Sequence, residues 1–162
     1  MTSSTAETTI TTPSDLEIVL SRVVDAHRAR VWDACTRPEH LLHWFGPRGW
    51  TLPVCEIDLR PGGARRLVSR RRDGTELGIN GLYREIVPPE RLTYTEWYDH
   101  DPEDLGELLV TFIFSDGDGR TTITARNLYR AKEARDLELA RVPQGFSESF
   151  DRLAQYLHTH DV

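Results

Sequence analysis

Arg60-Pro61-Gly62-Gly63 stands between an alternating apolar run, residues 52–59, and an arginine-rich run, residues 64–71. Proline lacks a backbone N–H and therefore ends a strand, while a glycine pair allows backbone conformations that other residues avoid. The stretch predicts a strand-ending turn at which a sheet folds back sharply. No helix start follows the two glycines, which argues against a phosphate-binding loop.

Strand patterns surround this turn on both sides. Asp73-Gly74 and residues 116–119 are typical of hairpin turns, and Pro88-Pro89 ends another run. The separated runs are rich in β-branched and aromatic residues, and they are residues 16–24, 52–59, 64–71, 76–87, 91–98, 108–114 and 121–125. The pattern predicts a long antiparallel sheet of six or seven strands.

Helical patterns occur at two places. A first pair of short helices follows the first strand: one opens at Asp25 or His27, and the next has Pro38 in its first turn and ends at Gly46-Pro47. Residues 132–139 are rich in helix formers, and Pro143 then interrupts the helical pattern. A final amphipathic helix is then predicted from apolar residues at helical spacing, namely Phe146, Phe150, Leu153, Ala154 and Leu157.

Composition limits the class of protein. The 162 residues carry a formal net charge of -6, which argues against a nucleic-acid or anionic-membrane binder. No apolar run approaches the roughly 20 residues of a membrane span, and the first residues do not form a signal peptide. Residues 1–14 are rich in Thr and Ser and are expected to be a disordered tail, with one domain over 15–162. Two cysteines are too few for a disulfide framework, and the expected location is the cytoplasm.

The order of motifs resembles the START-like (SRPBCC, Bet v 1-like) superfamily, and within it the branch named after the activator of Hsp90 ATPase (AHSA1). The motifs that carry the resemblance are Val31-Trp32 with residues 36–41, Trp44-Phe45-Gly46-Pro47, residues 58–63, residues 83–92, and Gly145-Phe146 with Asp151-Arg152-Leu153. The resemblance implies an α+β helix-grip fold, in which a curved antiparallel sheet surrounds the long C-terminal helix and two short helices follow strand one.

The resemblance also implies an apolar cavity between sheet and helix, and such spaces are the usual sites of small-molecule binding. The same side chains would otherwise simply fill a core. The aromatic candidates for the lining are Trp44, Phe45, Trp97, Phe112, Phe114, Phe146 and Phe150.

Charged residues in the apolar-alternating runs are candidates for a polar anchor. Arg22 shares strand parity with Leu16, Ile18 and Leu20. If it points into the cavity, it needs a carboxylate partner, which Glu56 or Glu96 could supply. The functional interpretation is a ligand anchor formed by Arg22 and Glu96. The alternatives are a structural ion pair or outward-facing charges.

Other patterns point to no specific chemistry. The histidines lack a metal-binding spacing, no nucleophile motif occurs, and no cofactor is expected. Arg65-Arg66 and residues 70–72 are expected to form a basic patch on a hairpin, either solvated or in contact with another protein. Catalysis of a polyketide cyclase type would rest on the family resemblance alone.

Two functions from different classes follow. The first is a protein that binds a small hydrophobic or aromatic molecule in its cavity, with or without a cyclase-like activity. The second is a protein-interaction or chaperone-cofactor-like module related to the Hsp90 activator domain. The sequence leaves homodimerisation open.

Overall fold

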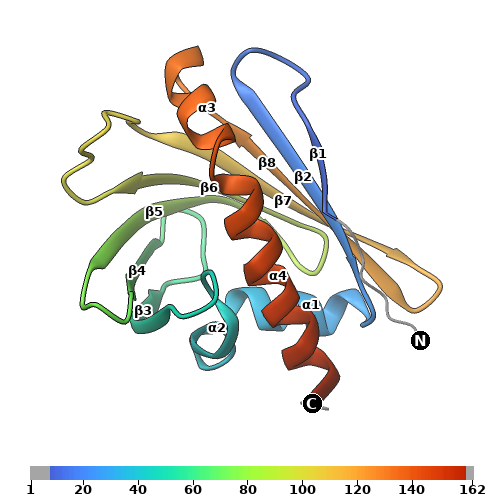
Figure 1. Cartoon of the computed structure of the whole chain (residues 1–162). Helices are drawn as coiled ribbons and strands as arrows, with labels where there is room; N and C mark the ends of the chain where they lie inside the picture. The colour runs from blue at the N-terminus through green and yellow to red at the C-terminus, as the bar shows by residue number, and fades with distance from the viewer. Residues whose placement is uncertain (1–7, 160–162) are drawn as a thin grey trace.

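A computed structural model describes residues 8–159. One antiparallel sheet of eight strands curves around the C-terminal helix α4, as Figure 1 shows. The strand order is β1-β2-β8-β7-β6-β5-β4-β3. The elements are β1 Thr9–Thr11, β2 Glu17–Val24, α1 Arg28–Thr36, α2 Pro38–Trp44, β3 Thr51–Ile57, β4 Ala64–Arg70, β5 Glu76–Val87, β6 Arg91–Tyr98, β7 Leu108–Gly117, β8 Arg120–Leu128, α3 Lys132–Leu139 and α4 Val142–Thr159.

The predicted α+β helix-grip architecture is confirmed, with one strand more than expected. Strands β2 to β8 correspond to the seven predicted runs. The eighth strand, β1, lies in the segment expected to be a disordered tail, and it pairs with β2 through Thr9–Ser21 and Thr11–Val19. Residues 1–7 lie outside the described residues. Edge pairing explains the difference, because a short strand can be held by backbone hydrogen bonds without an apolar side to bury.

The turn at residues 60–63 forms a corner between β3 and β4. Gly62 has a φ of +83°, and its N–H donates to the Tyr83 carbonyl oxygen at 2.8 Å. A Cβ on Gly63 would lie 2.0 Å from the backbone oxygen of Asp58, so no other residue fits there without a shift of the backbone. The glycine pair therefore has the architectural role that the sequence indicates.

The short helices α1 and α2 close one end of the sheet (Figure 1). Trp44 locks them together, because its indole N–H donates to the Ala34 carbonyl oxygen at 2.9 Å in a buried setting. Helix α4 begins at Val142, so Pro143 lies in its first turn rather than between two helices. Proline is tolerated in a first turn because the N–H that it lacks has no intrahelical partner there.

Helix α4 buries one face towards the sheet. Phe150, Leu153 and Leu157 are buried, whereas Gln155 on the same helix is exposed. The core continues into inward-facing residues of the strands, such as Ile18 and Leu67, which are both 0% exposed. Burying apolar side chains on this face stabilises the fold.

Candidate functional site

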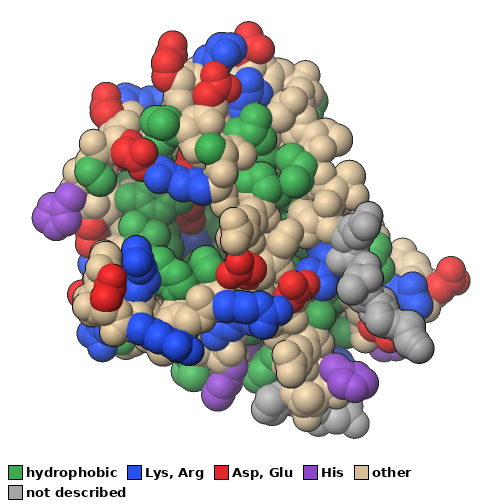
Figure 2. All heavy atoms as spheres, viewed as in Figure 1, with side chains coloured by type: hydrophobic (Ala, Val, Ile, Leu, Met, Phe, Trp, Pro, Cys, Tyr) green, Lys and Arg blue, Asp and Glu red, His purple; other side chains and the backbone are tan. Residues whose placement is uncertain are grey.

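A cavity of about 310 Å³ lies between the curved sheet and the first turns of α4. Its walls come from β2, β4 to β8, the helices and the segment that follows α2. Residues from most parts of the chain therefore line the cavity. Figure 2 shows a hollow at the surface with hydrophobic side chains inside it and charged side chains around its rim. The space therefore opens to the outside.

Aromatic rings form much of the cavity wall. Phe146 and Phe150 stack on α4 with ring centroids 4.3 Å apart. Phe150 in turn contacts Trp44 at 5.3 Å and Phe112 at 6.3 Å between centroids. Side chains locked by ring packing give a preformed wall that suits a flat, apolar molecule.

Seven of the nine predicted site residues line this cavity. They are Trp44, Phe45, Glu96, Phe112, Phe114, Phe146 and Phe150. Their role in ligand binding stays a prediction, because many of the same rings also pack in the core.

Trp97 lies on the other face of the sheet. Side chains alternate along a strand, and Tyr94, Glu96 and Tyr98 line the cavity, so Trp97 points away from it. Glu96 and Trp97 could not both face inward. The sequence signal for excluding Trp97 was this alternation.

Arg22 is buried but does not line the cavity. It is 5% exposed, and its Nη1 lies 2.6 Å from Asp151 Oδ1 on α4. The expected partners were wrong: Glu56 is exposed, and Glu96 pairs with another arginine. Asp151 was missed as a partner because the spacing of apolar residues along α4 predicts that Asp151 lies on the solvent-facing side of the helix.

The partner of Glu96 is Arg65 on β4, with 3.2 Å between Nη1 and Oε1. Arg65 is only 6% exposed, and its guanidinium lies 4.0 Å above the Tyr94 ring. The interpretation of Arg65 as part of a solvated patch is therefore wrong. Tyr98 donates its hydroxyl to Glu96 Oε2 at 2.7 Å.

A second carboxylate, Glu138 on α3, lines the same cavity and is 5% exposed. Arg141 donates to its Oε2 at 2.9 Å. Burial raises the pKa of Glu138, against the effect of Arg141, and the nearby charge of Glu96 raises it further. Burial, then Glu96 and Glu138, raises the pKa of Tyr98 well above its usual value. Glu138 was not predicted as a site residue, because composition identifies residues 132–139 only as helix formers.

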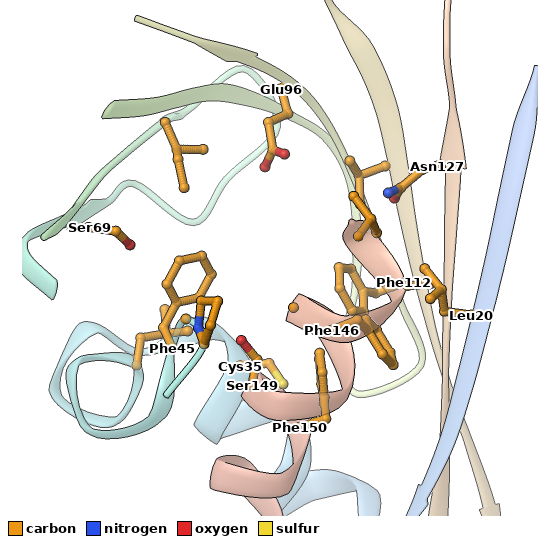
Figure 3. Close-up of a pocket in the computed structure, with 18 of the residues that line it drawn as sticks. Leu20, Cys35, Phe45, Ser69, Glu96, Phe112, Asn127, Phe146, Ser149 and Phe150 are labelled. Atoms are coloured by element: carbon orange, nitrogen blue, oxygen red, sulfur yellow. The ribbon is translucent and has the colours of Figure 1, made fainter. Parts of the chain in front are cut away.

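Figure 3 shows where the polar side chains of the wall lie. Glu96 points into the space from the sheet, Ser149 lies on α4, and Cys35 lies at the end closed by the helices. Burial raises the pKa of the Cys35 thiol, so the thiolate is scarce at neutral pH. A nucleophilic role for Cys35 gains no support from this environment.

Among residues 8–159, no three His, Cys, Asp or Glu side chains are placed to hold a metal ion. None of the described helices is long and apolar enough to cross a membrane.

Solved structures share this architecture. A crystal structure of a protein from Rhodobacter sphaeroides is 30% identical, with a TM-score of 0.88, and the match covers 95% of this chain and 99% of that one. A protein from Nitrosomonas europaea is 24% identical, with a TM-score of 0.80 over 91% of this chain and 97% of that one. An AHSA1 protein from Silicibacter pomeroyi is 23% identical, with a TM-score of 0.72 over 88% and 97% of the two chains. No curated protein matches the sequence.

The family comparison covers most of the chain. Residues 25–158 match the model of the family described as activator of Hsp90 ATPase homolog 1-like protein. This range runs from the end of β2 to the last turn of α4, and it includes every cavity-lining residue except Leu20. The chain therefore belongs to the activator of Hsp90 ATPase homolog 1-like family.

Proposed function

We propose that the protein binds a compact, largely apolar molecule with an aromatic ring in the cavity beneath α4. The observation that carries the proposal is an open space of about 310 Å³ whose walls are mostly aromatic and aliphatic. Ligand pockets span roughly 300–1,000 Å³, so this one is at the small end of the range. Its size favours a compact ring system over a long-chain lipid.

The alternative is a docking surface for a protein. Such a surface is expected to gather exposed apolar side chains in one patch. Here the exposed large hydrophobic residues are spread over different parts of the fold, for example Ile10 on β1, Leu42 on α2, Leu82 on β5 and Leu137 on α3. This distribution favours ligand binding over a partner-binding role.

A cavity-filling substitution tests the proposal. Ser149 lines the cavity from α4, so Ser149→Phe should occupy part of the space without removing a wall residue. The probe is N-phenyl-1-naphthylamine, a neutral fluorophore whose emission rises in apolar surroundings. We expect saturable binding to the unsubstituted protein and an affinity at least roughly tenfold lower in Ser149→Phe, because a filled pocket excludes the ring.

The matched control is Gln155→Phe on the exposed face of the same helix, which should leave probe affinity unchanged. Denaturant unfolding of both variants checks that each is folded. Equal probe affinity in all three proteins, or no saturable binding to any of them, contradicts the proposal. Native mass spectrometry of the protein purified from its own cells is a separate test that shows whether the protein retains a small molecule.

A further inference from the structure

The polar end of the cavity is built from two carboxylates that come from different layers of the fold. Glu96 projects from β6 in the sheet, and Glu138 projects from α3, which precedes the long helix. Both side chains are largely enclosed, at 15% and 6% exposed. An enclosed carboxylate is costly unless hydrogen-bond donors and positive charge surround it.

Three side chains around this end donate to the two carboxylates, while the cavity-lining Asn127 donates to the Tyr129 hydroxyl. Arg65 Nη1 donates to Glu96 Oε1, and the Tyr98 hydroxyl donates to Glu96 Oε2. Arg141 Nε donates to Glu138 Oε2. Arg65 Nε is fully enclosed and has no partner within the described part of the chain, so it offers no donor at the cavity surface.

Acceptor capacity remains on both carboxylates. Each carboxylate oxygen can accept about two hydrogen bonds. Each oxygen of Glu96 has one donor, and no described residue donates to Glu138 Oε1. A ligand that enters this end therefore meets carboxylate oxygens that can accept a further hydrogen bond.

The distribution of positive charge also favours a ligand that donates hydrogen bonds. Arg141 is shared between Glu138 and Glu103, and it is 52% exposed, so water screens it from the cavity. Arg65 is the enclosed cation, and it is matched by Glu96. Glu138 is thus the carboxylate whose charge is least compensated on the cavity side.

We infer that the ligand carries a positively charged hydrogen-bond donor, such as a protonated amine, which it presents to Glu96 and Glu138 while its ring lies against the aromatic wall. The inference rests on the proposed function and specifies the class of ligand. An added carboxylate would instead place a third negative charge beside the two that line this end. The aromatic rings of the wall are compatible with a nearby cation because their faces are electronegative.

Three ligands of similar shape test the inference: the amine 2-naphthylmethylamine, the hydrocarbon 2-ethylnaphthalene and the carboxylic acid 2-naphthylacetic acid. Their affinities are measured by displacement of N-phenyl-1-naphthylamine at neutral pH. We expect the amine to bind about tenfold more tightly than the hydrocarbon, as one hydrogen bond to a charged group provides, and the acid to bind most weakly. Equal affinity of the amine and the hydrocarbon, or tightest binding of the acid, overturns the inference.

Glu138→Gln identifies the group responsible. This variant keeps the shape of the side chain and alters the charge pairing of Arg141 alone, which is half-exposed and keeps Glu103 as a partner. We expect it to lose most of the preference for the amine, measured as the ratio of the affinities of the amine and the hydrocarbon, whatever its own affinity for the fluorophore. Glu96→Gln is a weaker choice, because it would remove the charge partner of the enclosed Arg65.

The control is Glu107→Gln, an exposed residue just before β7 that does not line the cavity, and it should keep the full preference. A preference that persists in Glu138→Gln contradicts the assignment. Failure of the fluorophore to bind any folded variant refutes the proposed function itself. Normal fluorophore binding without a preference for the amine refutes only the present inference.

Discussion

Arg65 and Glu96 form an enclosed ion pair across an intervening strand, with 3.2 Å between Nη1 and Oε1. The register places Gly81 of β5 directly between them, opposite Arg65 on one side and Glu96 on the other. The absence of a side chain at residue 81 leaves room for the arginine to cross. A Cβ there would lie 2.9 Å from Arg65 Cγ and 2.5 Å from the Thr95 backbone oxygen.

Replacing Gly81 with alanine should therefore disrupt the pair. We expect Gly81→Ala to lower the free energy of unfolding by roughly 3 kcal/mol, because overpacking and a disturbed enclosed ion pair act together. The measurement is denaturant unfolding followed by fluorescence. Gly117→Ala is the control, because no atom lies within 4 Å of a Cβ at that glycine. A change no larger than in Gly117→Ala would show that Arg65 does not depend on this gap.

The ion pair between Arg22 and Asp151 should respond asymmetrically to substitution. Arg22 is 5% exposed, whereas the Asp151 side chain is 43% exposed. We expect Asp151→Asn to cost about 3 kcal/mol, because it leaves an enclosed arginine without a charge partner. Arg22→Met should cost less, since Asp151 keeps contact with water and lies 3.6 Å from Arg48.

Denaturant unfolding of the two single variants and the double variant measures this coupling. Arg22→Met should also leave the affinity for N-phenyl-1-naphthylamine unchanged, because Arg22 does not line the cavity. A loss of probe affinity in a folded Arg22→Met variant would restore the role of ligand anchor that the sequence suggested.

The sequence predicted the fold better than the polar part of the site. Strand runs, hairpin turns and the apolar stripe of α4 are local signals, and they determine which residues lie on the concave face. They therefore identified rings such as Phe112 and Phe150. The partner of a buried charge is different, because it depends on which strands are neighbours and in which register.

Gly81 illustrates the missing information. Arg65 and Glu96 are 31 residues apart in sequence, and their pairing follows from the alignment of β4, β5 and β6. Glu138 could not be placed either, because only the packing of α3 over the end of the sheet turns its side chain inward. Strand alternation, in contrast, was available from the sequence, and it distinguishes Trp97 from Glu96.

On the outer face, Asp99 should make stability depend on pH in acid. Arg66 donates two hydrogen bonds to its carboxylate, at 2.9 and 2.8 Å, and Asn80 adds a third at 2.9 Å. These bonds lower the pKa of Asp99 from 3.8 to about 2. The ionised form is favoured in the folded protein, so the contribution to stability is complete above about pH 4 and is lost as the pH falls towards 2.

Asp99→Asn should therefore be less stable than the unsubstituted protein near neutral pH and should show a smaller loss of stability between pH 4 and pH 2. Unfolding by urea at a series of pH values gives both quantities. Asp118→Asn, in the exposed turn between β7 and β8, should keep the full dependence. Parallel stability profiles of Asp99→Asn and the unsubstituted protein would contradict this role for Asp99.

Cys35 should report directly on occupancy of the cavity. Cys35 lines it, whereas Cys55 on β3 does not. Burial raises the pKa of both thiols, that of Cys55 to about 11, so both should react slowly with N-phenylmaleimide at neutral pH. In Cys55→Ser, where Cys35 is the remaining thiol, saturating N-phenyl-1-naphthylamine should slow the reaction further. In Cys35→Ser the same probe should leave the reaction of Cys55 unchanged, because that thiol lies outside the cavity. Equal protection of the two cysteines would indicate that the probe acts through global stability and not by filling the space beside Cys35.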